Sequence, residues 1–336
     1  MAEQKLIPMD KVRELVGGHD YEKSFNFDFS DRGVQIAYED ENWTFSRNKK
    51  EFRVSPIAIN SLIGTVELPT AFRKFASSYP DLLAHNINYL LKRKAGASKA
   101  LRIKNRIVAF APPDATIIKN DTIVDTIEKS FGSEAKIDKC SVRPDGTTDI
   151  NVVSSDGDKL QVGQGDMFNS GVHIQNHPYG VSRPQVDGYL LRLVCLNGAI
   201  GMDEVFRAPT IIGEDPKNWL RASITKARKT TTQLFESIKA LSNREIEGNV
   251  QDLLEGLYVE LALPSKVQDL INRRVGREGA ESMYDIFNHF THVASNVGVV
   301  RRDPILRNRL MRASSHYASH VAEVCNNCNR PRLSLN

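Results

Sequence analysis

Residues 190–201 read LLRLVCLNGAIG, an almost wholly apolar run that carries Cys195 and breaks at Asn197-Gly198. An apolar run that ends in a turn dipeptide is typical of a buried strand closed by a tight turn. Free cysteine is among the residue types most often buried, and the local sequence places no base beside this thiol. We therefore expect Cys195 to pack in a core strand rather than to act as a nucleophile or a metal ligand.

The segments before this run favour a sheet with mostly antiparallel strands. FNFDF (25–29), GVQIAYE (33–39) and WTFSR (43–47) alternate with a period of two, which is typical of short strands. Further strands are predicted near 135–142, 147–154, 159–163, 168–175 and 186–196. LRIKNRIVAFA (101–111) is predicted as one strand with a buried and a cationic face. Helices are predicted from Ser55-Pro56, over 80–94 and over 121–131, so 21–208 is expected to be an α+β core domain.

After Pro209 the pattern becomes helical. One apolar seam has heptad-like spacing. It can be interpreted as a helix of an intramolecular bundle or as an intermolecular coiled coil. The seam consists of Leu220, Ile224, Ala227, Thr231, Leu234, Ile238 and Leu241. Capping signals at Ser265, Ser282 and Asp303-Pro304 predict three more helices, the last reaching about Val324. We expect a helical C-terminal domain over 213–325, a tail over 326–336 and a flexible or partly helical arm over 1–20.

Composition narrows the class of protein. The chain has 336 residues, of which 40% are hydrophobic and 26% charged, so a packed core in two domains is expected. Four cysteines do not make a disulfide framework. The first residues, MAEQKLIPMDK, lack the apolar centre of a signal peptide, and no apolar run is long enough to cross a membrane. These features predict a protein of a reducing compartment that has no membrane partner.

The familiar catalytic motifs are absent from the sequence. There is no GxxxxGK[ST], GxSxG or HExxH, so we predict that the protein is not an enzyme. The alternative is a metal-dependent nuclease that uses aspartates in the 145–166 region, although Gly-containing turns favour a structural role for them. These aspartates are Asp145, Asp149, Asp156, Asp158 and Asp166. His173 and His177 stand four residues apart, too far to share an ion if the strand is extended.

A possible metal site lies near the C-terminus. His316 and His320 are one helical turn apart, and Cys325 and Cys328 form a C-x-x-C pair. Two histidines and two cysteines are a good tetrahedral ligand set for structural zinc. The helix would have to end near 321–322 for all four to converge. The alternative is a helix with two ordinary histidines and an exposed pair of cysteines, and no other cofactor is predicted.

Two basic clusters stand out although the net charge is only +4. The span from Asp81 to Asp114 contains no acid between its ends. Its cations are Lys92, Arg93, Lys94, Lys99, Arg102, Lys104 and Arg106. The second cluster consists of Arg301, Arg302, Arg307, Arg309 and Arg312. Both clusters are predicted to contact phosphates, and Tyr89, Phe110, Tyr179 and Tyr189 are available to stack on bases.

One long segment resembles a known family. Residues 168–200, FNSGVHIQNHPYGVSRPQVDGYLLRLVCLNGAI, are similar to the family called domain of unknown function nine-three-two. The resemblance rests on 170–172, Asn176, Gly180 and RLVCLNG (192–198), and it extends over about 50–200 with LPTAFRKFASSYPDLLAHNINYLL and LRIKNRIVAF. His177-Pro178 replaces a small polar residue of the family pattern. Membership implies a phage, prophage or plasmid origin, and hence the cytoplasm of a bacterial host, but no mechanism.

These observations lead to a functional prediction. We expect a phage-type nucleic-acid-binding protein that binds or anneals single-stranded DNA in recombination or replication. By analogy with phage annealing proteins, which work as rings or filaments, a homo-oligomer is expected. The alternative is a non-enzymatic phage protein that binds a host protein through its helical half, which the heptad seam would favour.

Overall fold

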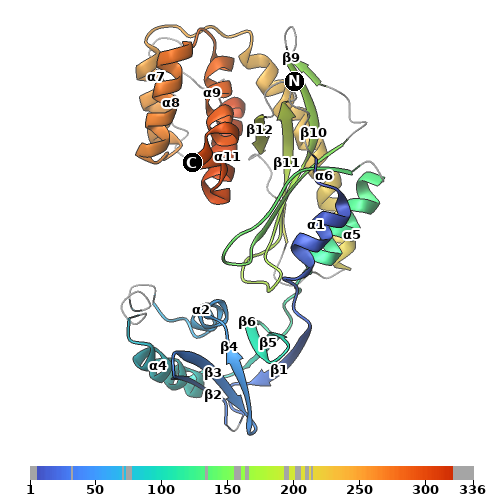
Figure 1. Cartoon of the computed structure of the whole chain (residues 1–336), viewed down its shortest axis with the longest axis vertical. Coiled ribbons are helices and arrows are strands. Elements are labelled where there is room, and N and C mark those ends of the chain that lie inside the picture. The colour runs from blue at the N-terminus through green and yellow to red at the C-terminus, as the bar shows by residue number, and fades with distance from the viewer. Residues whose placement is uncertain are drawn as a thin grey trace.

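The computed structural model describes residues 6–31, 33–69, 72, 78–132, 135–154, 160–162, 166–192, 197–200, 206–208, 212 and 215–320. Its fold is α+β, as the sequence predicts. Two lobes are visible, each built on its own sheet (Figure 1). We call residues 23–111 the small lobe. The large lobe consists of helix α1 (Met9–Gly17) and the described residues from 116 to 320.

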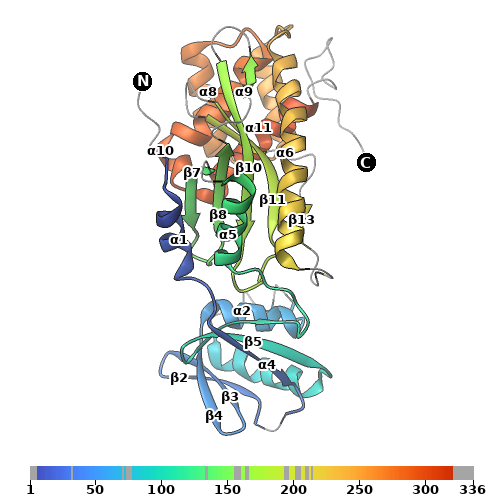
Figure 2. The same ribbon diagram turned by 90° about the vertical axis from the view of Figure 1, so that its right-hand side faces the viewer.

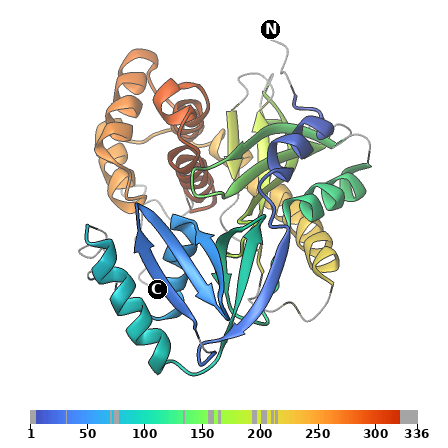
Figure 3. The same cartoon turned by 60° about the horizontal axis from the view of Figure 1, so that its bottom comes forward.

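The small lobe is a six-stranded sheet covered on one face by helices. Its strand order is β1-β5-β6-β4-β3-β2, and all pairs are antiparallel except β4 with β6. The strands are β1 (Lys23–Asp28), β2 (Gln35–Glu39), β3 (Asn42–Arg47), β4 (Lys50–Val54), β5 (Ala97–Ile103) and β6 (Arg106–Ala111). Helix α2 (Pro56–Thr65) begins where predicted, because the Ser55 side chain accepts a hydrogen bond from Ala58 N. Helix α4 (Pro80–Arg93) packs beside β2 (Figure 3).

The prediction of one strand over 101–111 was wrong, because the segment folds back on itself. Lys104 and Asn105 form the turn of a tight hairpin, in which Ile103 pairs with Arg106. Lys104 has a φ of 51°, the left-handed conformation that such turns require. The hairpin places Lys104 and Arg106 at an exposed tip instead of along one face of a strand.

The large lobe contains an antiparallel sheet between two groups of helices. Its strand order is β12-β11-β10-β8-β7, with β13 on β11 and β9 on β10. The strands are β7 (Ala135–Val142), β8 (Thr148–Ser154), β9 (Leu160–Val162), β10 (Asp166–Asn176), β11 (Gln185–Arg192), β12 (Asn197–Ile200) and β13 (Phe206–Arg207). Helices α1, α5 (Asn120–Phe131) and α6 (Pro216–Leu241) lie on one side of the sheet, and α9 (Met283–Asn296) and α11 (Pro304–His320) on the other (Figures 1 and 2).

Helix α6 accounts for the heptad-like seam. All seven seam residues are buried inside the chain, against β10, β11 and neighbouring helices. Gly188 of β11 lies directly under α6, since a Cβ there would stand 2.9 Å from Thr231 Oγ1. The seam is therefore intramolecular, and the interpretation as an intermolecular coil was wrong.

Two antiparallel strands replace the single strand that was predicted to end at Asn197-Gly198. Strand β11 ends at Arg192, and β12 pairs back on it in the register Arg192 to Asn197. Asn197 and Gly198 thus lie inside a strand, so the predicted turn at these two residues was wrong. Cys195 lies outside the described residues, and its packing stays a prediction.

The capping signals were right in two of three cases. Ser282 and Asp285 form a reciprocal capping box at the start of α9. Asp303 Oδ1 accepts hydrogen bonds from the first backbone amides of α11. Ser265 is not a cap, because Pro264 takes that position before α8 (Ser265–Glu278) and offers no side-chain acceptor. Helices α7 (Val250–Glu260) and α10 (Gly298–Arg301) complete the set in the described part of the chain.

The two lobes do not coincide with the domains whose boundaries were predicted at residues 20, 208 and 213. One apolar cluster combines β10 and β11 with α6 to α9 and α11, so the helical region shares its core with the sheet. The segment predicted as an arm contains α1, whose Val12 and Val16 are fully buried. Among the described helices, none is both long enough and apolar enough to cross a membrane.

The small lobe is inserted between α1 and α5. Asp20 lies after α1, and its carboxylate accepts hydrogen bonds from Asn120 N at 2.8 Å and Asp121 N at 3.1 Å. Asn120 Nδ2 also donates to Val16 O. These contacts hold the point where the chain enters the small lobe against the point where it returns.

Candidate anion-binding site

The two faces of the large-lobe sheet differ in polarity. One face is apolar and packs on α1, α5 and α6. The other carries a row of polar side chains across four neighbouring strands, in the register Lys139–Asn151–His173–Asp187. We call this the polar face. Such a row costs free energy when it is buried unless its members are hydrogen-bonded.

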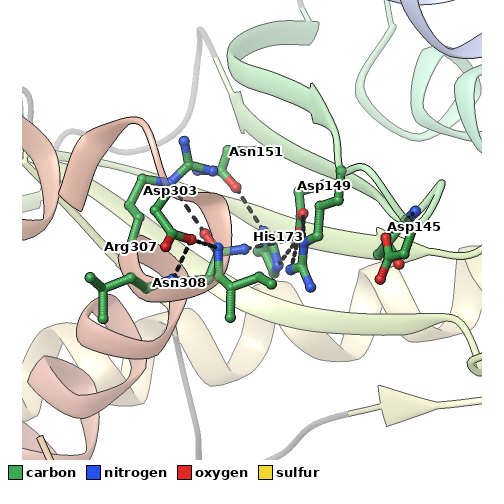
Figure 4. Close-up of polar contacts among 11 residues, drawn as sticks. Asp145, Asp149, Asn151, His173, Asp303, Arg307 and Asn308 are labelled. Atoms are coloured by element: carbon green, nitrogen blue, oxygen red, sulfur yellow. Dashed lines mark hydrogen bonds and ion pairs between the residues drawn. The ribbon is translucent and has the colours of Figure 1, made fainter. Parts of the chain in front are cut away.

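Helix α11 covers part of the polar face, and its Arg307 and Asn308 lie near Asp149, Asn151 and His173 of the sheet (Figure 4). Asn308 Nδ2 donates to Asp149 Oδ1 at 2.8 Å, and Arg312 Nη2 donates to Asp187 Oδ2 at 2.5 Å. Arg307 is also buried and donates to Asn308 Oδ1. The sheet and α11 are therefore joined by paired charges rather than by apolar packing alone.

The buried charges shift one another's protonation. Burial raises the pKa of Asp149 and of Asp187 above the usual value, although each faces an arginine. Burial also lowers the pKa of His173 well below its usual value, and the nearby arginines lower it further. His173 Nδ1 lies 2.7 Å from Asn151 Oδ1. A neutral imidazole at the centre of the polar face follows from these surroundings.

A hollow of about 570 Å³ lies at the edge of the polar face. We call it the arginine pocket. It is lined by Arg143, Gln175, Arg207, Glu260, Leu261, Ile305, Asn308, Arg309, Arg312, Ala313 and His316. Arg143 is fixed from behind by Asp149, which accepts from its Nε at 2.6 Å and its Nη2 at 2.8 Å. Four guanidinium groups and one lining carboxylate make the pocket a site for anions.

A second hollow, of about 850 Å³, lies between the lobes. We call it the lobe cleft. The small lobe contributes Arg53, Lys104 and Arg106 to its lining, and the large lobe contributes Pro144 and Tyr179. No acid lines it among the described residues. Arg143 of the arginine pocket and Pro144 of the lobe cleft are consecutive residues, so this turn contributes to the lining of both hollows.

Only some residues of the first predicted basic cluster, between Lys92 and Arg106, line these hollows. Lys104 and Arg106 line the lobe cleft. Arg102 instead lines a smaller hollow with Phe25, Arg47 and Phe52, and it donates to Lys104 O.

The remaining members of this cluster lie elsewhere. Lys92 and Arg93 are exposed at the end of α4. Lys94 Nζ donates to Thr65 O and Glu67, and Lys99 Nζ donates to Ala115 O, so these two residues help to hold the small lobe together.

The second predicted cluster is divided between the surface and the interior. Arg301 and Arg302 are exposed, and Arg309 and Arg312 line the arginine pocket. Arg307 is only 5% exposed, so its prediction as a surface contact was wrong.

Two of the four aromatic side chains predicted to stack on bases are not accessible. Phe110 and Tyr189 are buried in the cores. Tyr179 lines the lobe cleft, although little of its surface is exposed, and Tyr89 is exposed on α4 beside Arg93. Stacking on bases is therefore left to Tyr89 and to the exposed edge of Tyr179.

The sequence analysis missed Arg53, Arg143 and Arg207. Each is a single cation in a strand or beside a turn, so a search for runs of basic residues does not find it. Arg143 did carry a local signal, since it stands between a strand and Pro144-Asp145-Gly146. The partners that fix these residues come from distant parts of the sequence.

The metal predictions are not supported by the described residues, where no group of three or more His, Cys, Asp and Glu side chains could hold an ion. Asp149 pairs with Arg143, and Asp166 pairs with Arg192. His316 Nε2 lies 3.6 Å from Glu260 Oε1.

Other members of these sets cannot be placed. Asp156, Asp158, Cys325 and Cys328 lie outside the described residues, as does the side chain of His320. The zinc set therefore stays a prediction.

Comparisons with known proteins returned no relative. No family model matches the chain, and no curated protein and no solved structure matches it.

Proposed function

We propose that the protein binds single-stranded nucleic acid along the lobe cleft and the arginine pocket. The observation that carries this proposal is the lining of the two hollows. They bring together Arg53, Lys104 and Arg106 from one lobe with four arginines from the other, against one lining acid. Phosphates bind where several Lys and Arg side chains are within reach of one backbone.

Single strands fit this surface better than a duplex does. Both hollows are recessed, so a ligand that fills them has to follow an uneven surface. A single strand bends at low cost, whereas a duplex is stiff over tens of base pairs. A role of such binding in the recombination or replication of a phage or plasmid remains a prediction.

The alternative of a host-protein partner has lost the feature that favoured it. The heptad seam is covered by the protein's own sheet and offers no surface to a second chain. The expected homo-oligomer rests on the analogy with phage annealing proteins and stays a prediction.

The test is a fluorescence-anisotropy titration with labelled single-stranded and duplex oligonucleotides at two salt concentrations. We expect tighter binding to the single strand. Reversal of Lys104 and Arg106 to Glu should reduce the slope of log affinity against log salt by about 0.7 for each lost phosphate contact.

The matched control reverses Arg221 and Arg228. They line a basic hollow of about 350 Å³ at α5 and α6, on the other side of the sheet. This change should leave the slope unchanged. Equal losses in both variants would contradict the proposed interface, and no binding at low salt would contradict the function.

A further inference from the structure

The arginine pocket brings four guanidinium groups to one hollow, although Asp149, Asp187 and Glu260 offset three of their charges. A terminal or free phosphate monoester offers such donors three terminal oxygens and close to two negative charges at neutral pH. An internal phosphodiester offers two oxygens and one negative charge. Arg143, Arg207, Arg309 and Arg312 line one hollow of about 570 Å³. Arginine favours such groups, because its planar donors match phosphate oxygens in pairs.

Two of these arginines are fixed in place by buried acids. Asp149 holds Arg143 through two hydrogen bonds, and Asp187 holds Arg312. The side chains of both aspartates have no exposed surface. The acids orient these two guanidinium groups from the protein side and offset their charge, so the remaining positive charge of the pocket comes from Arg207 and Arg309. A site with donors held in place loses less conformational entropy on binding.

Donors remain available for a ligand. A guanidinium group has five N–H donors. Arg312 donates one hydrogen bond to Asp187, and Arg309 donates one to the Ala262 carbonyl. Arg207 is exposed at the mouth of the pocket. Among the described residues, Arg207 and Arg309 therefore keep most of their donors unused, whereas Arg312 Nε is buried and cannot reach a ligand.

Apolar side chains also line the pocket. Leu261, Ile305 and Ala313 are among its lining residues, and Ile305 is 59% exposed, which is high for a large apolar side chain. A bare phosphate ion would leave Ile305 uncovered. A ligand with a flat, partly apolar group next to its phosphate could cover it. A nucleoside monophosphate has both parts.

We propose that the arginine pocket binds the phosphomonoester group of a nucleotide, with its base against Ile305. The ligand can be a free nucleotide or the phosphorylated end of a strand. Since a free nucleotide satisfies the site, this inference does not depend on the proposed strand binding.

The first experiment is isothermal titration calorimetry of the whole protein with three probes. These are deoxyadenosine monophosphate, deoxyadenosine and inorganic phosphate. The monophosphate should bind at least about tenfold more tightly than either of the other two, which corresponds to about 1.4 kcal/mol. Equal affinity for the monophosphate and deoxyadenosine would overturn the inference.

Variants locate the site. Arg309→Ala and Arg207→Ala alter exposed side chains, so the fold should survive, and each should weaken monophosphate binding by about tenfold. Arg221→Ala, an exposed arginine of the hollow on the other side of the sheet, is the matched control and should change it less than about twofold. A larger loss in the control than in the pocket variants would place the nucleotide elsewhere and overturn the proposal.

A second arm separates the two sources of the phosphate. Labelled single-stranded oligonucleotides with a 5′-phosphate and with a 5′-hydroxyl are compared by anisotropy. Tighter binding of the phosphorylated strand, lost in Arg309→Ala, assigns the pocket to strand ends. Equal binding of the two strands together with a bound monophosphate assigns it to free nucleotides.

The same two arms separate this inference from the proposed function. Monophosphate binding with no oligonucleotide binding would reject strand binding alone. Oligonucleotide binding with no response to either the monophosphate or the 5′-phosphate would reject this inference alone.

Discussion

At the scale of single residues, His173 shows how the polar face sets protonation. The imidazole is fully enclosed, with Asp149 and Asp187 on the neighbouring strands and Arg307 and Arg312 on α11. Burial is the largest cause of its lowered pKa. The folded protein therefore keeps this histidine neutral at a pH at which the unfolded chain already binds a proton.

This difference predicts how stability depends on pH. A folded pKa below the unfolded value of about 6.5 means that the contribution of His173 is complete above pH 6.5 and is lost as the pH falls further. Each pH unit below that value costs at most about 1.4 kcal/mol. We expect the free energy of unfolding to fall more between pH 7.5 and pH 5.5 in the wild type than in His173→Gln.

Urea denaturation of both proteins at the two pH values measures this effect. The raised pKa values of Asp149 and Asp187 act in the opposite direction. Both aspartates are present in both proteins, although Asp149 Oδ1 lies 3.6 Å from His173 Nε2 and is therefore coupled to the substitution. Parallel pH dependence of the two proteins would show that His173 does not titrate between the folded and unfolded states.

At the scale of elements, Gly171 sets how closely β10 and β8 approach. A Cβ at this position would lie 1.9 Å from Val152 O, which is backbone and cannot move aside. We expect Gly171→Ala to lower the free energy of unfolding by about 3 kcal/mol or more. Thermal or urea denaturation measures the loss.

Gly276 supplies the matched control. It lies within α8, and nothing stands within 4 Å of a Cβ there. Gly276→Ala should therefore stabilise the protein by about 0.5–1 kcal/mol. Similar effects of the two changes would contradict the close strand contact.

Asp20 supplies a second prediction at this scale. Its carboxylate caps the N-terminus of α5 from 100 residues away in the sequence. Asp20→Ala should cost about 1 kcal/mol of stability, and Asp20→Asn should retain most of it, because asparagine also accepts at a helix start. Equal losses in both variants would point to charge rather than capping.

The elements also show what a sequence can predict. Ser55-Pro56, Ser282 with Asp285, and Asp303-Pro304 mark helix starts through local contacts, so these helices were found. The turn at Lys104-Asn105 was missed, because alternation of residue types continues through a tight hairpin. The arginine pocket was missed because Arg143, Asp149 and α11 meet only after the chain has folded.

At the scale of the whole molecule, both lobes line the lobe cleft, whereas the large lobe alone lines the arginine pocket. The consecutive residues Arg143 and Pro144 contribute to both linings. A single-stranded nucleic acid that crosses both hollows would make more contacts as its length increases. We expect affinity for single-stranded oligonucleotides to rise with length and then level off. Arg309→Glu should lower the level reached and move the plateau to shorter oligonucleotides. Anisotropy with a series of lengths measures this, and a uniform loss at every length would contradict a strand that spans both hollows.

The insertion of the small lobe has a consequence for the order in which the protein is made. Helix α1 leaves the ribosome first, but its partners α5 and β7 follow only after about 100 further residues. At a typical speed of 5–20 residues per second, α1 would wait for roughly 5–20 seconds. The small lobe is one continuous segment of the chain with its own apolar core. It can therefore fold during this wait. The first helix of the large lobe is thus synthesised before the small lobe, whereas the rest of the large lobe is synthesised after it.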